Sequence, residues 1–305
     1  MKRMTLILAA GFVAAGGAAN VDAQSANTFA GPSVTLPASV VPRAAFFIGL
    51  GGSYNVANFG TQNVYAVGTS NVYQNGVLTS SGSAAGPAQI YMGSETAAAF
   101  SVQGGYFQNF SGSNWLWGAK FAYSYLGATS TVRNALLPQA GSFTPTGSNT
   151  PVPFTGNALV QSYQTKITHQ MALIPFIGRS FERSFIYIGA GPTLSQMRTN
   201  LDGLIGFADI NGTRTDVSGD PVNFSSSGWV YGGAAVVGAT YFFDRSWFLD
   251  VSYTFAMTSN QNGNYSSPFS NPNGTNGSTV VGTLVGNSSG NAITQGVTAT
   301  INKTF

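Results

Sequence analysis

His169 and the serines near it are the first residues of this chain whose types could do chemistry. His169 is the single histidine, and Ser162 and Ser180 are its nearest serines along the chain. A serine hydrolase needs its nucleophile, its histidine base and an orienting acid within hydrogen-bond reach of one another. Strand alternation places His169 on a different face from both serines. We therefore favour an outward-facing structural position for His169, and keep a lipid-modifying hydrolase as the alternative.

An acidic segment is the second candidate. Residues 199–228, expected to be a loop, contain four aspartates together with Arg214: Asp202, Asp209, Asp216 and Asp220. Oxygen-rich loops bind divalent cations, and such a cation could bridge to the phosphates of lipopolysaccharide. The spacing does not match a calcium loop of the EF-hand type. A solvated polar loop is therefore the favoured interpretation, and a cation site of unknown metal is the alternative.

The composition sets limits on the class of protein. Charged residues make up 7% of the chain, against about 25% in an average soluble domain. The chain has no cysteine, so it uses no disulfide and no thiolate metal site. A net charge of +3 without a basic run does not indicate nucleic-acid binding. The sequence contains no phosphate loop and no paired catalytic carboxylates, so we expect no enzymatic activity and no cofactor.

The N-terminal residues have the pattern of a secretory signal. Lys2 and Arg3 precede a small apolar run, and Val21–Ala23 resembles a cleavage site of small residues. We expect residues 1–23 to be the signal peptide and residues 24–42 to be a flexible leader, because its three prolines each remove a ladder donor. Residues 43–305 are then the folded domain.

From residue 43 onward the chain repeats segments in which apolar and polar residues alternate. The segment from Trp247 to Thr258 is the clearest, with Leu249, Val251 and Tyr253 on one face. Such alternation is weak for one segment but strong over many. We predict eight strands, the last ending on Phe305, at residues 44–59, 98–110, 115–125, 161–177, 185–197, 229–243, 247–258 and 292–305.

The connections between these strands alternate in length. Short ones follow the second, fourth and sixth strands, and long ones of roughly 30 residues or more follow the others. Aromatic residues at both strand ends suit two membrane interfaces. The pattern predicts an all-β fold, an eight-stranded antiparallel transmembrane β-barrel with four long extracellular loops and short periplasmic turns. The alternative is an exported β-sandwich.

Two of the long loops have features of their own. The first contains Asn75–Gly76 near Val77 and Leu78, which is a hairpin signal, so this loop could extend outward as a β-ribbon. The fourth, residues 259–291, is an uncharged tract rich in Asn, Gly and Ser, and we expect mobile turns there.

The lumen is expected to contain few charges. Alternation directs Lys120, Lys166 and Asp250 inward, and Lys120 and Asp250 lie at similar depth on opposite walls. An eight-stranded barrel is only wide enough inside for side chains. We predict an ion pair between Lys120 and Asp250, with Gln103 and Ser252 nearby. The alternative is two separately hydrated charges.

The signal, the alternating strands, the long outer loops and the terminal Phe305 resemble the small outer-membrane barrels of Gram-negative bacteria, of the OmpA-type and opacity-protein-like superfamily. This resemblance implies a location in the cell outer membrane, contact with its lipid and lipopolysaccharide, and recognition of Phe305 by the barrel-assembly machinery. Lys303 departs from the usual apolar position two residues before the end. The implied function is non-enzymatic: surface loops for envelope integrity and for contact with an unidentified extracellular ligand. A narrow porin-like channel for small solutes is the alternative.

Overall fold

The computed structural model describes residues 39–210 and 212–305, and it is built almost entirely of β-strands. The predicted signal peptide and residues 24–38 of the predicted leader lie outside the described residues. At the end of that leader, Val41 is buried and the Val40 N–H donates to the carbonyl of Glu182 at 2.8 Å. In the described part of the chain, no helix has the length and apolar character needed to cross a membrane.

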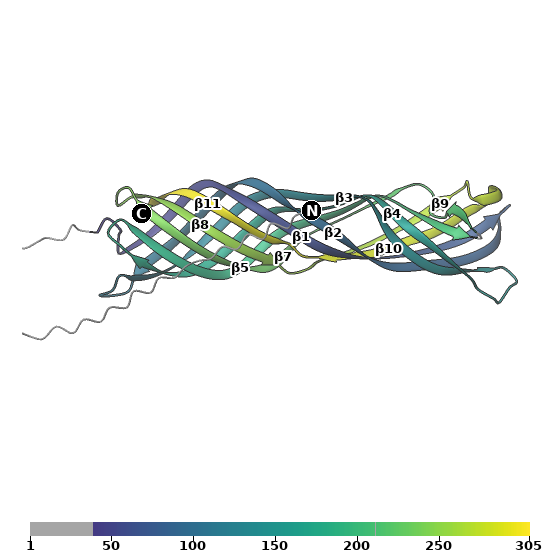
Figure 1. Cartoon of the computed structure of the whole chain (residues 1–305), viewed down its shortest axis with the longest axis horizontal. Helices are drawn as coiled ribbons and strands as arrows, with labels where there is room; N and C mark the ends of the chain where they lie inside the picture. Colours follow the sequence, from purple (N-terminus) through teal and green to yellow (C-terminus); the bar gives the residue numbers. More distant parts are fainter. Residues whose placement is uncertain (1–38, 211) are drawn as a thin grey trace, which may run out of the picture. The chain divides into compact units, whose positions relative to one another are not determined.

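Eight strands pair in antiparallel order and close into a ring (Figure 1). The closing pair runs from Phe47 opposite Thr304 to Asn58 opposite Ile293. Each strand of the ring therefore has two neighbours, as predicted, and the ring is closed. The ring strands are β1 (Ala44–Gln74), β2 (Val77–Asn109), β3 (Trp115–Pro145), β4 (Val152–Ser180), β5 (Ser184–Ile210), β7 (Val222–Phe242), β8 (Trp247–Thr258) and β11 (Ile293–Thr304).

The residues expected to form long loops largely continue the strands beyond the ring. The first one is the expected β-ribbon: β1 and β2 are joined by Asn75 and Gly76, both with positive φ (51° and 79°). The fourth consists of β9 (Gln261–Asn271), the short helix η1 (Thr275–Gly277) and β10 (Thr279–Gly290). The expectation of mobile turns at 259–291 was wrong, because β10 pairs with the extended part of β1 and with β9.

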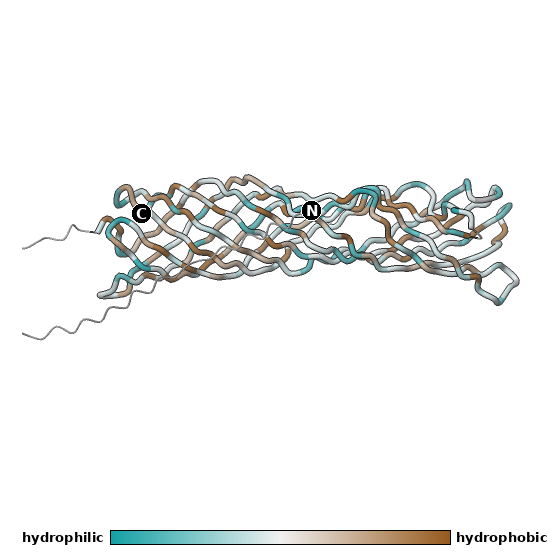
Figure 2. Tube along the Cα trace, viewed as in Figure 1, coloured by the Kyte–Doolittle hydropathy of each residue, from teal (hydrophilic) through white to brown (hydrophobic). Residues whose placement is uncertain are grey.

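The exterior of the ring carries an apolar band. At the end of the band next to the short turns, the charged side chains include Arg43, Arg179 and Asp244. At the other end of the band, outward charges begin again at Lys166 and Arg198, which lie opposite each other in the β4–β5 ladder. Figure 2 shows hydrophobic stretches recurring along the strands at the end of the barrel that holds the C-terminus. Exposed apolar residues of the band include Ile48, Leu50, Phe100, Phe121, Leu173, Ile188, Val237, Val251 and Ile301.

A bulge in β4 changes which of its residues face inward. The pairing register of β4 with β5 shifts between Ile167 and Gln170, and a bulge adds one residue to one strand of a pair. Side chains beyond it therefore exchange faces. Tyr163 and Ile167 are completely buried, and the prediction that Lys166 faces inward was wrong, because Lys166 is partly exposed on the outer surface.

The wall is interrupted between β2 and β3. These strands pair at both ends of their contact, but residues 86–100 of β2 and 125–139 of β3 form no ladder with each other. Pro87 and Pro138, which lack an N–H donor, lie in the unpaired stretch. The backbone of β3 also adopts positive φ twice there, at Gly127 and Asn134.

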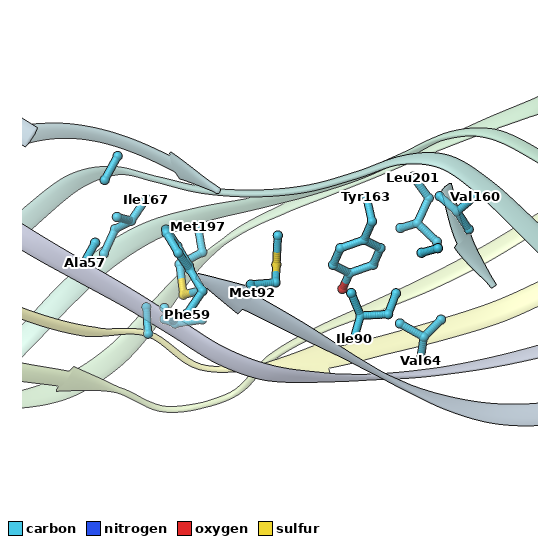
Figure 3. Packing of buried hydrophobic residues seen from close by; sticks show 14 of the residues in the cluster. Ala57, Phe59, Val64, Ile90, Met92, Val160, Tyr163, Ile167, Met197 and Leu201 are labelled. Atoms are coloured by element: carbon cyan, nitrogen blue, oxygen red, sulfur yellow. The ribbon is translucent and has the colours of Figure 1, made fainter. Parts of the chain in front are cut away.

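The interior contains two clusters of buried apolar side chains. One lies near the short turns and contains Phe47, Phe107, Phe185, Phe242 and Phe248. The second lies farther along the barrel, around Phe59, Met92, Tyr163, Ile167 and Met197 (Figure 3). Along β3, Lys120 lies between Leu116 of the first cluster and Leu126 of the second. A polar layer therefore separates two apolar ones.

Candidate functional site

The polar layer is centred on a buried ion pair. Lys120 Nζ lies 3.2 Å from Asp250 Oδ2, and both side chains are about 95% buried (5% and 4% exposed). Lys120 is carried by β3 and Asp250 by β8, so the contact crosses the lumen. The structure thus brings together the two charges singled out from the sequence.

Tyr187 of β5 joins these two charges. Lys120 Nζ donates to the Tyr187 hydroxyl at 2.6 Å, and that hydroxyl donates to Asp250 Oδ1 at 2.9 Å. The ammonium also lies 4.9 Å from the centre of the Tyr187 ring. A buried ion pair is stable only when further hydrogen bonds satisfy its remaining donors and acceptors, and Tyr187 supplies one of these.

Gln103 of β2 completes the layer. Its Oε1 accepts from Lys120 at 3.3 Å, and its Nε2 donates to Asp250 Oδ2 at 2.9 Å. The same Nε2 lies 2.8 Å from Thr300 Oγ1 and 2.9 Å from Asn302 Oδ1 on β11. The layer therefore links β2, β3, β5, β8 and β11. Such a fully bonded network is rigid, whereas a partly satisfied one is costly.

The network and the aromatic cluster lie next to each other inside the lumen. A small polar cavity of about 50 Å³ lies against the network, lined in part by Ser124, Gln170 and Ser252. On the turn side, Phe107 contacts both Phe185 and Phe242, at ring-centroid distances of 5.2 and 6.3 Å. Ser252, predicted as a polar partner of the pair, lines this cavity.

Tyr187 and the inward phenylalanines were not found from the sequence. Their signal is present, because apolar residues occur as adjacent doublets at the strand ends next to the short turns: Phe46–Phe47, Tyr106–Phe107, Phe242–Phe243 and Trp247–Phe248. In a strand, adjacent residues face opposite sides. One member of each doublet must therefore point into the barrel.

The structure does not gather the four aspartates into a cation site. Asp202 and Asp209 lie on β5, and Asp216 ends β6 (Thr213–Asp216). Asp216 Oδ1 accepts from the N–H groups of Ser218 and Gly219 at 3.0 and 3.1 Å. Within residues 39–210 and 212–305, no three His, Cys, Asp or Glu residues are grouped to hold a metal. Strand alternation and the β5–β6 hairpin keep these carboxylates apart.

His169 belongs to an aromatic group on the outer surface. Its Nδ1 lies 2.8 Å from the Tyr123 hydroxyl, and its ring stacks on Trp229 at 6.2 Å between centroids. Tyr125 meets the same ring edge-on at 5.2 Å. Aromatic residues gather where a membrane meets water. His169 thus occupies the outward-facing position expected of it, but the predicted separation of His169 from Ser162 was wrong, because the bulge in β4 turns Ser162 to the outer face as well.

Phe305 follows the closing strand directly. Its N–H donates to the carbonyl of Phe46 at 2.9 Å, while its side chain is 73% exposed. Lys303 Nζ lies 5.7 Å from the ring centres of both Phe305 and Trp247. The terminal ring is thus accessible on the outside of the barrel, and its role as an assembly signal stays a prediction.

Comparisons with known proteins found similarity in structure alone. The outer membrane protein OprG from Pseudomonas aeruginosa matches with 8% identity over 88% of this chain and 99% of its own, at a TM-score of 0.35. Neisserial surface protein A matches with 10% identity over 82% and 99% (TM-score 0.31). The outer membrane protease OmpT from Escherichia coli matches with 13% identity over 90% and 100% (TM-score 0.32).

No protein-family model and no curated protein matches the sequence. The structural similarities are too low to carry an argument about function. Ring closure and the apolar exterior band are properties of this chain itself. They make it a transmembrane β-barrel of the type found in the outer membrane of Gram-negative bacteria.

Proposed function

We propose that this outer-membrane barrel is a non-enzymatic surface protein. The parts of the strands that extend beyond the ring, here called the outward β-arms, support envelope integrity and contact an extracellular ligand. The observation that carries this proposal is the buried network that occupies the lumen. The Lys120–Asp250 pair and the aromatic cluster beneath it fill the membrane-embedded interior. Because side chains occupy this interior, the outward arms are the part of the barrel that can contact other molecules.

The composition of two of these arms supports a role in contact. The β1–β2 arm and the β9–β10 arm lie side by side through the β1–β10 ladder. Neither residues 44–94 nor residues 251–302 include a single charged side chain, and both are rich in Asn, Ser, Gly and Tyr. Antibody loops use the same residue types to combine rigid aromatic contact with adaptable hydrogen bonds. Such arms suit a neutral polar surface, of protein or glycan, better than an ionic one.

Shortening the first arm tests this function. Asn63 and Gln89 face each other in the β1–β2 ladder, so residues 64–88 can be replaced by an Asn-Gly turn. Cells displaying this variant should lose adhesion to an epithelial monolayer and self-aggregation, while the heat-shifted gel band still reports a folded barrel. A matched control exchanges only Asn75 for Asp and should retain both. Unchanged surface phenotypes after removal of all the arms would reject the proposal.

A narrow channel for small solutes remains the second candidate, and the small polar cavity beside the network is the feature that favours it. Single-channel recording of the refolded protein in a planar bilayer separates the two. We expect a silent membrane with folded protein present. Stable conductance steps would show that water passes the Lys120–Asp250 layer, and the channel would become the leading function.

A further inference from the structure

We propose that the outward half of the barrel contains a binding site for one small, neutral, apolar molecule. The extended strands surround a cavity of about 330 Å³ that is partly open to solvent, separate from the polar layer in the membrane-embedded part. This inference goes beyond the contact function of the arms, since it concerns their interior.

The cavity wall is built from apolar side chains of several strands. Val64 of β1, Leu137 of β3 and Leu201 of β5 are at most 3% exposed, and all three line the cavity. Phe224 and Tyr265 add aromatic surface, with ring centroids 5.3 Å apart. Further lining residues are Ala158, Leu204, Phe207, Ala208, Phe269, Val280 and Leu284. Such walls offer water few hydrogen-bond partners, so they favour an apolar occupant.

Polar residues lie where the strands end in turns. Gln74 comes from the β1–β2 arm and Asn276 from the β9–β10 arm, and both line the cavity. The segment after β6 folds onto it as well: Val217 and Ser218 are lining residues, and Ser218 is 1% exposed. The lining is thus mainly apolar, with polar side chains interspersed on the strands, such as Asn157 and Asn287, and at the turns, a mixture typical of ligand pockets.

The polar groups of the wall define the charge of the ligand. Asp216 is the one charged residue among the described lining residues, and its carboxylate already accepts from two backbone N–H groups. The Tyr265 hydroxyl lies 2.6 Å from Ser288 Oγ, and burial raises the pKa of Tyr265, which keeps it neutral. An anionic ligand would meet no cation in this lining, and a cationic one would meet only Asp216 beside a largely apolar wall, so the site favours neutral molecules.

The size of the cavity limits the ligand. An apolar cavity of about 150 Å³ is enough to bind benzene, and typical ligand pockets start at about 300 Å³. This cavity therefore suits a molecule of roughly two fused rings, or a hydrocarbon chain of similar volume. A folded chain that left so large an apolar space unfilled would lose packing contacts, and an apolar ligand restores them.

Binding of naphthalene to the protein tests the site. The full mature chain is reconstituted in lipid nanodiscs, and binding is followed by the fluorescence of naphthalene against empty nanodiscs. Val280 and Val281 are adjacent on β10, but Val280 is 6% exposed and lines the cavity whereas Val281 is 39% exposed and does not. Val280→Trp should fill the cavity and weaken binding at least tenfold, and Val281→Trp should leave it unchanged.

Three results would overturn the proposal. The first is naphthalene binding no stronger than to empty nanodiscs, and the second is equal binding by Val280→Trp and wild type. The third is binding by polymer-solubilised, lipid-free protein but not in nanodiscs, which would assign the site to a lipid acyl chain. If Val280→Trp does not fold, Leu284→Ala replaces it. Leu284→Ala enlarges the cavity, so this variant should bind anthracene more tightly than the wild-type protein does. Equal or weaker binding of anthracene would also count against the site.

Discussion

Gly238 and Tyr187 face each other in the β5–β7 ladder so closely that a Cβ on Gly238 would lie 2.3 Å from Cζ of Tyr187. The Tyr187 hydroxyl is held by Asp250 and Lys120, so the ring cannot move aside without breaking the polar layer. Glycine at position 238 is therefore a requirement of the lumen network rather than of the backbone.

Substitution of Gly238 should disturb this network. We expect Gly238→Ala to lower the free energy of unfolding by about 1–3 kcal/mol, the range for overpacking a buried site. Urea unfolding of the refolded protein in lipid vesicles measures the effect. Gly228→Ala on the same strand is the control, because a Cβ there meets nothing within 4 Å. Equal stability of the two variants would show that Tyr187 moves freely.

Breaking the ion pair from one side should be costly. Asp250→Asn leaves the Lys120 charge buried without its counter-ion, and we expect a loss of about 3–5 kcal/mol in unfolding free energy. Asp220→Asn, at an exposed position, is the control and should change stability little. A double variant, Lys120→Met with Asp250→Leu, removes both charges and should recover part of the loss. An Asp250→Asn protein as stable as wild type at every pH would make the pair unimportant.

Phe305 should affect assembly more than stability. In Phe305→Ala the backbone bond to the Phe46 carbonyl remains, and the lost ring is mostly exposed, so the folded barrel should unfold at nearly the same urea concentration. Insertion in cells, followed as the heat-shifted gel band in a pulse-chase experiment, should be slower. Phe305→Tyr keeps an aromatic end and should insert normally. Wild-type insertion kinetics for Phe305→Ala would remove the terminal ring from the assembly signal.

The interrupted β2–β3 ladder predicts an alternating pattern of hydrogen exchange. In residues 86–100, the amides that face β1 are paired and should be protected, whereas those that face β3 have no ladder partner and should exchange faster. The β1-facing amides of the same stretch are the internal control. Residue-resolved exchange by NMR in nanodiscs measures this, and uniform protection would mean that the wall closes there.

Local sequence determined the barrel and part of its lumen. Period-two alternation identifies each ring strand because one face meets lipid and the other meets the interior, and the short turns fix antiparallel neighbours. Asn75–Gly76 was sufficient to predict the first ribbon, since its two residues accept positive φ. The same alternation directed Lys120 and Asp250 inward at similar depth.

Other features depend on tertiary structure. The extended strand β10 exists because β1 and β9 supply its ladder partners, which the uncharged tract from 259 to 291 does not reveal on its own. The bulge at Ile167–Gln170 reverses the faces of β4, and it is visible only once β4 is paired with β5. Tyr187 joins the ion pair, and the outer cavity forms, because closing the ring brings distant strands together. The alternation of apolar and polar residues predicts which face of a strand a residue occupies. The residues that it contacts across the barrel depend on the pairing register of the strands and on closure of the ring.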